Sequence, residues 1–333
     1  MRSSILVLPA LLLVTIPGIA LADDLADCAA LVASPYETDY RDTGHEVLGD
    51  VDIKAAETAC LAAIDADPDS MQARTWQARI HYYFGEYDTA LDLLEPAATA
   101  KNPYAQQMLG DILIDGLGGV PVDEARALEL LKASAAAGFA PGQNSLGVSY
   151  ERGQGVTVDM KKAAEYYALA AKQGMPTAQV NLGILYTNGT GVTEDDARAA
   201  DLFRSAAESG DPSGMNSLGV SYELGEGIDK DLDLAMAWYR KASAGGSAIA
   251  TANVGNLYLS GLGVPVDQQR GLKWVSKSAS AGNSYGLFLL AGLYEDGEAI
   301  DRDLDHAIEL YRQAADLGST GAEDALIRLG EAE

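Results

Sequence analysis

The sequence predicts an all-α protein, a solenoid of stacked helix-turn-helix repeats. Three observations predict it: a tyrosine returns every 36 residues, a glycine follows each tyrosine three positions later, and no stretch alternates polar and apolar residues as a strand does. Self-similarity at such a period is typical of helical pairs that stack along one direction. The tyrosines are Tyr150, Tyr186, Tyr222, Tyr258 and Tyr294.

The first helix of each repeat ends near this tyrosine. Four residues before it stands an apolar residue and eight before it a small one, as in Ala178, Leu182 and Tyr186. This spacing places all three on one helix face, so we expect them to be buried against neighbouring helices. The following glycine suits the left-handed end of a helix. These glycines are Gly153, Gly189, Gly225, Gly261 and Gly297.

An aspartate opens the second helix of each repeat. Its carboxylate can accept hydrogen bonds from the free N–H groups of the first turn and oppose the helix dipole. The aspartates are Asp123, Asp159, Asp195, Asp231, Asp267 and Asp303.

This frame divides the chain into four parts. We expect a leader at 1–22, a helical region with a tetratricopeptide-like unit at 23–103, six repeats over 104–319 and a C-terminal capping helix at 320–333. The six repeats are predicted at 104–139, 140–175, 176–211, 212–247, 248–283 and 284–319.

The first 22 residues have the pattern of a secretory signal peptide. Arg2 precedes an apolar run from Ile5 to Ile19, and Ala20-Leu21-Ala22 offers a small-x-small cleavage site. An uncleaved anchor is the alternative, but the run is short for a bilayer and acidic residues follow it. We therefore expect export across the inner membrane to the periplasm, or beyond the cell, with no membrane insertion after cleavage.

Cys28 and Cys60 are the only two cysteines. In an oxidising compartment they can form one disulfide, and two buried thiols are the alternative. A metal site is not expected, because two cysteines without neighbouring histidines make an incomplete ligand shell.

The repeat resembles a known family. Residues 178–192 read A-Q-V-N-L-G-I-L-Y-T-N-G-T-G-V, and with Asp195, Ala199 and the run Trp238-Tyr239-Arg240-Lys241-Ala242 they resemble the Sel1-like repeat, a relative of the tetratricopeptide repeat. Residues 79–91 resemble a tetratricopeptide unit itself. The resemblance implies a right-handed α/α superhelix and a role in binding envelope or host proteins.

Composition argues against nucleic acid and membrane partners, and the motifs argue against an enzyme. The chain carries 49 acidic and 23 basic residues, a net charge of −26, which disfavours nucleic acid and anionic membranes. The G-x-G pairs follow helices rather than strands, so they indicate helix ends and not a dinucleotide loop. His45, His81 and His306 are scattered and form no metal or triad pattern. No cofactor is expected.

The residues that the repeat motif leaves free are the candidates for contact with a partner. In the related solenoids the first helix lines the concave face, and its outward positions lie three before, one after and four after the glycine of each Leu-Gly or Val-Gly pair. An apolar floor with acidic edges suits a partner segment carrying Lys or Arg. The candidates are Asn144, Val148, Glu151, Val180, Ile184, Thr187, Asn216, Val220, Glu223 and Asn256.

The sequence thus predicts a non-enzymatic protein–protein interaction scaffold or regulator of the cell envelope. A receptor for glycan or peptidoglycan fragments is the alternative. An enzyme that binds or hydrolyses β-lactams ranks third, because the relatives linked to that activity carry cysteine pairs in each repeat that this chain lacks.

Overall fold

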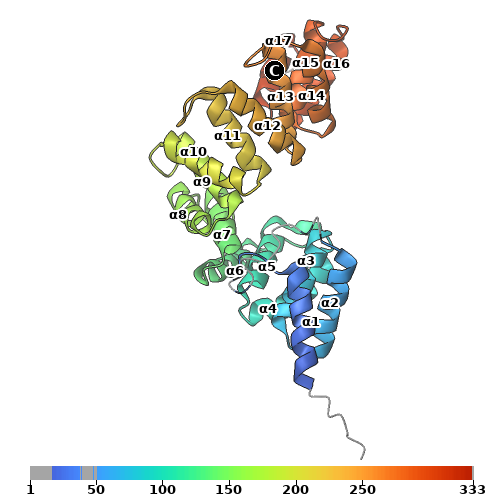
Figure 1. Cartoon of the computed structure of the whole chain (residues 1–333), viewed down its shortest axis with the longest axis vertical. Coiled ribbons are helices and arrows are strands. Elements are labelled where there is room, and N and C mark those ends of the chain that lie inside the picture. The colour runs from blue at the N-terminus through green and yellow to red at the C-terminus, as the bar shows by residue number, and fades with distance from the viewer. Residues whose placement is uncertain (1–16, 38, 40–47, 49–50, 332–333) are drawn as a thin grey trace, which may run out of the picture. The chain divides into compact units, whose positions relative to one another are not determined.

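The computed structural model describes residues 17–37, 39, 48 and 51–331 (Figure 1). Within these residues the chain forms seventeen α-helices and the short 3₁₀ turn Leu117–Gly119, with no strand. The all-helical prediction is therefore confirmed. The expected leader lies mostly outside the described residues, although the first helix begins at Pro17, before the predicted cleavage site.

The described chain divides into two compact bodies, with the boundary between Gly142 and Gln143, inside α7 (Ala140–Arg152). The N-terminal body contains α1 (Pro17–Val32), α2 (Ile53–Ala66), α3 (Met71–Tyr83), α4 (Tyr87–Thr99), α5 (Pro103–Asp115), the turn Leu117–Gly119 and α6 (Glu124–Ala136). The C-terminal body contains α7 (Ala140–Arg152), α8 (Met160–Lys172), α9 (Pro176–Asn188), α10 (Asp196–Glu208), α11 (Pro212–Leu224), α12 (Leu232–Ala244), α13 (Ala248–Ser260), α14 (Gln268–Ser280), α15 (Ser284–Asp296), α16 (Leu304–Asp316) and α17 (Thr320–Leu329).

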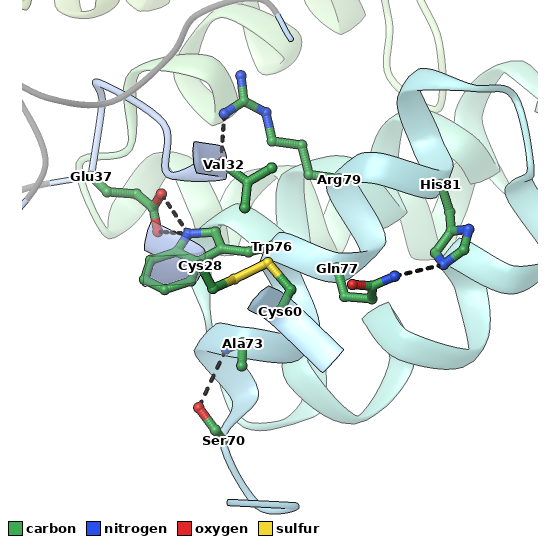
Figure 2. The surroundings of a disulfide bond; sticks show 10 residues. All are labelled: Cys28, Val32, Glu37, Cys60, Ser70, Ala73, Trp76, Gln77, Arg79 and His81. Carbon is green, nitrogen blue, oxygen red and sulfur yellow. Dashed lines mark hydrogen bonds between the residues drawn. A yellow bond between two sulfur atoms is a disulfide. The ribbon is translucent and has the colours of Figure 1, made fainter. Parts of the chain in front are cut away.

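A disulfide lies in the core of the N-terminal body. It joins Cys28 of α1 to Cys60 of α2, whose Cα atoms are 4.7 Å apart, and both cysteines are fully buried beside Trp76 of α3 (Figure 2). The Trp76 indole Nε1 donates to the Glu37 carboxylate, and the Arg79 guanidinium donates to the carbonyl of Val32 at the end of α1. Covalent and polar contacts thus hold α1, α2 and α3 in one cluster.

In each repeat the first helix, here called helix A, packs against the second, here called helix B. The glycine of the Leu-Gly or Val-Gly pair in helix A makes this possible, because it lies directly under a large side chain of helix B. A Cβ placed on Gly219 would lie 2.7 Å from the Tyr239 ring, and one on Gly183 would lie 2.4 Å from the Phe203 ring. A side chain at either position would therefore force the two helices apart.

The predicted helix ends are confirmed. Each repeat aspartate is the N-cap of helix B and accepts a hydrogen bond from the backbone N–H three residues on, as Asp231 does from Leu234. Gly189, Gly225, Gly261 and Gly297 cap helix A in the left-handed conformation, and Gly153 also has a positive φ.

The second glycine of the G-x-G pair has a different role. Gly227 has φ +68°, and a Cβ there would lie 2.0 Å from the carbonyl oxygen of Asp196, in the first turn of α10. The loop after α11 therefore lies directly against the helix B of the preceding repeat.

Gly227→Ala should lower the free energy of unfolding by about 2–3 kcal/mol, because it adds a backbone clash to the cost of a positive φ. Urea denaturation measures this. Gly210→Ala is the matched control: its φ is +92° but nothing lies within 4 Å of the added Cβ. It should cost about 1 kcal/mol. Equal costs for the two variants would show that the close approach at Gly227 does not matter.

The repeated tyrosine is less buried than its position in the motif predicts. Tyr186, Tyr222 and Tyr294 are half-buried, whereas Tyr150 and Tyr258 are buried. Basic side chains from the first turn of helix B lie over three of these rings, with Arg198 5.6 Å from the Tyr186 centroid. The tyrosine therefore lies between the end of helix A and the first turn of helix B, partly covered by a basic side chain.

Candidate protein-binding face

The candidate contact residues lie on helices α7, α9, α11 and α13 of the C-terminal body. We call this set of positions the helix-A face: three before, one after and four after the glycine of each Leu-Gly or Val-Gly pair. Ile184 is the most exposed of the candidates, with 42% of its surface accessible. Eight others are half-buried: Asn144, Val148, Glu151, Thr187, Asn216, Val220, Glu223 and Asn256.

Val180 is the most buried of the candidates. It is only 7% exposed and lies in a core cluster with Phe203 of α10 and Leu218 of α11. Val180 therefore packs against the next repeat and offers little surface to a partner.

Two asparagines of the face hold neighbouring helices A together. The Asn181 amide of α9 donates to the Asn144 oxygen of α7 at 3.2 Å, and Asn253 of α13 donates to Asn216 of α11 at 2.9 Å. These amides are engaged within the solenoid, so Asn144 and Asn216 have a structural role as well as a place on the face.

Glutamates occupy the third position of the face in the second and fourth repeats, and Glu295 occupies the equivalent position in the sixth, where Ala291 replaces the glycine. Glu151 of α7, Glu223 of α11 and Glu295 of α15 each accept a hydrogen bond from a tyrosine hydroxyl of the paired helix B, sixteen residues further on. The Tyr239 hydroxyl lies 2.6 Å from Glu223. Burial and this hydrogen bond raise the pKa of Tyr239 above its usual range, so the hydroxyl remains a donor.

The intervening repeats place Thr187 and Leu259 at the same position. Sixteen residues further on, helix B has Phe203 and Val275 instead of tyrosine, so the polar glutamate–tyrosine pairs alternate along the C-terminal body with pairs whose helix-B member is apolar.

A cavity of about 250 Å³ opens on this face between α9, α10 and α11. Three of the predicted contact residues, Ile184, Thr187 and Val220, line it. The remaining lining residues are Asn188, Phe203, Ser217, Ser221 and Glu226. The cavity therefore has an apolar floor and a carboxylate among its walls.

Sequence reasoning missed the helix-B side chains that lie behind the face: Tyr167, Tyr239 and Phe203. One signal was available for the tyrosines. Residues 144–151 and 216–223 both read N-S-L-G-V-S-Y-E, an identity at twice the repeat length. It marks the doubled period that the glutamate–tyrosine pairs follow.

The described residues contain no group of three or more His, Cys, Asp or Glu side chains arranged to hold a metal ion. The same part of the chain includes no helix long and apolar enough to span a bilayer.

Comparison with known proteins agrees with this architecture. The Sel1 repeat model matches six consecutive segments, residues 103–139, 140–175, 176–211, 212–247, 248–283 and 284–319. No curated protein matches the chain.

Two solved structures extend the likeness. A Sel1 repeat protein from Oxalobacter formigenes is 30% identical, with 72% of this chain and 96% of that one covered and a TM-score of 0.65. The second is c5321, described as a protective antigen present in uropathogenic Escherichia coli strains and displaying an SLR fold. It is 29% identical, the match covers 94% of this chain and 67% of that one, and the TM-score is 0.59.

The consecutive helix pairs and these matches define a helical-repeat protein of the class that generally mediates protein–protein interaction and is typically not catalytic. The chain belongs to the Sel1 repeat family.

Proposed function

We propose that this protein is a non-enzymatic scaffold or regulator of the cell envelope that binds a segment of a partner protein on the helix-A face. The cavity beside Ile184 is the observation that supports this most directly. Three of its lining residues, Ile184, Thr187 and Val220, are ones that the repeat motif does not require, so they are free to serve a partner.

The size of the cavity favours a side chain over a free ligand. Small-molecule sites enclose about 300–1,000 Å³, and this one has about 250 Å³. An aliphatic or aromatic side chain of an extended or helical segment would fill it, with Ile184 and Val220 supplying apolar contact.

The alternative, a receptor for glycan fragments, has less support. Sugars stack on exposed aromatic faces, but cations cover ring faces of Tyr150, Tyr186 and Tyr258.

The buried disulfide supports the proposed location outside the cytoplasm, since disulfides persist in oxidising compartments.

Site-specific photocrosslinking tests the proposed face. With the photoreactive residue p-benzoylphenylalanine at Ile184, we expect a covalent adduct to a discrete protein in an envelope extract. Leu169 of α8 is the matched control, because it is also an exposed aliphatic residue, 48% accessible, but lies on a helix B.

An Ile184→Asp variant should lose the partner in a pull-down, and Leu169→Asp should keep it. Equal crosslinking from both positions, or equal retention by both variants, would show that the helix-A face is not the binding surface.

A further inference from the structure

We propose that Glu151 and Glu223 are two receptor sites for arginine side chains of the partner, each formed by a carboxylate held in place by a buried tyrosine. This inference rests on the proposed function and specifies its chemistry. The protein contains its own example of the interaction, at the third glutamate–tyrosine pair.

That example is Arg328 of α17. Its guanidinium donates from Nη1 to Oε1 of Glu295 at 2.6 Å and from Nη2 to Oε2 at 2.8 Å, while the Tyr311 hydroxyl donates to the same carboxylate at 2.8 Å. Arg328 lowers the pKa of Glu295, as expected for a charge-assisted pair. A glutamate–tyrosine pair of this fold therefore binds a guanidinium in bidentate geometry.

The other two pairs repeat the first half of this arrangement. Tyr239 donates to Glu223 and Tyr167 donates to Glu151 from equivalent positions of helix B, and both rings are almost fully buried, at 1% and 0% exposure. The rigid rings fix the two carboxylates as Tyr311 fixes Glu295.

The arginine that completes the arrangement at Glu295 has no counterpart among the described residues at the other two pairs. Arg328 follows Glu295 by 33 positions, and the same step from Glu151 and Glu223 reaches Ile184 and Asn256. Neither side chain carries a charge, and among the described residues no cation forms an ion pair with Glu151 or Glu223. In our proposal the cation comes from the partner.

Arginine fits this role better than lysine. A carboxylate that already accepts one hydrogen bond still presents two oxygens to a planar guanidinium, which binds them as a fork, whereas an ammonium is a point charge. The net charge of −26 further favours a basic segment.

The repeat spacing sets the distance between the two arginines. Glu151 and Glu223 lie on α7 and α11, with α9 between them, so two interhelical steps of about 8–10 Å separate them. An extended segment rises about 3.3 Å per residue, so arginines about six positions apart would reach both sites. Ile184 and its cavity lie between the two glutamates along the chain, where the intervening residues would pass.

The test uses a fluorescein-labelled peptide with two arginines separated by five glycine or serine residues, and fluorescence anisotropy of the full chain. Glu151→Gln and Glu223→Gln should each weaken binding by about five-fold, since the amide keeps the acceptor for tyrosine but loses the charge. Glu165→Gln and Glu208→Gln, at exposed positions of helices B, are the charge-matched controls and should leave the affinity unchanged. The same peptide with lysines should bind more weakly than the arginine peptide.

Two further variants change the number of open sites. Asn256→Arg should place a guanidinium on Glu223 and raise the melting temperature. It should also lower the affinity for the peptide to that of the Glu223→Gln variant. Arg328→Ala should release the Glu295–Tyr311 pair and strengthen binding of a peptide with a third arginine.

Equal loss of affinity in the glutamate variants and in their controls, or no binding at millimolar peptide, would overturn the arginine sites. Crosslinking from Ile184 in the same preparation separates this outcome from failure of the proposed function. A partner that still crosslinks there would bind the face without these carboxylates.

Discussion

Tyr239→Ala is expected to lower the free energy of unfolding by about 3–5 kcal/mol, the range for truncation of a fully buried aromatic side chain. Tyr239 is 1% exposed, its ring packs directly on Gly219 of α11, and its hydroxyl donates to Glu223. The variant leaves a void between helices A and B and removes the hydrogen bond of a half-buried carboxylate. Urea denaturation followed by circular dichroism measures the loss.

Two further variants separate the contribution of the hydroxyl from that of the ring, and the helix-B tyrosine from the motif tyrosine. Tyr239→Phe removes only the hydroxyl and should cost about 1–2 kcal/mol. Tyr186→Ala, at the motif tyrosine of the preceding repeat, should also cost about 1–2 kcal/mol, because that ring is half-buried beneath Arg198. A larger loss at Tyr186 than at Tyr239 would mean that the motif tyrosine, not the helix-B ring, is the main packing residue.

Removal of the disulfide is the second large effect. Cys28→Ala combined with Cys60→Ala should lower the stability of the N-terminal body by about 3–4 kcal/mol, the chain-entropy estimate for a loop of this size, since 32 positions separate the two residues. The core around Trp76 loses its covalent link between α1 and α2.

Tryptophan fluorescence can assign this loss to one body. Trp76 reports the N-terminal body, whereas Trp238 and Trp274 lie on α12 and α14 of the C-terminal body. Denaturation of the double alanine variant should shift the Trp76 transition in a background where Trp238 and Trp274 are phenylalanine. An unshifted Trp76 transition would show that the non-covalent core suffices.

Much of the fold could be predicted because its signals are local. The aspartate cap, the left-handed glycine and the apolar stripe act within one or two turns of a helix, so a single repeat such as residues 176–211 contains them all. Repetition then separates signal from chance, since six copies share the same frame.

The details of the face could not be predicted, because they depend on contacts between helices. Val180 and Ile184 are both aliphatic and one turn apart on α9, yet the first packs on Phe203 and Leu218 while the second is exposed. Likewise the partner of Glu223 stands sixteen residues away on another helix, and nothing in the local pattern points to it. Which face a neighbouring repeat covers is decided by packing geometry rather than by periodicity.

The alternation of polar and apolar pairs changes what counts as one copy of this structure. The Asn144–Asn181 and Asn216–Asn253 hydrogen bonds join the second repeat to the third and the fourth to the fifth. The translational unit of the C-terminal body is therefore two repeats, and each such tandem brings one glutamate–tyrosine pair. Adding or removing a whole tandem keeps this alternation, so the length of the solenoid and its number of carboxylates grow together.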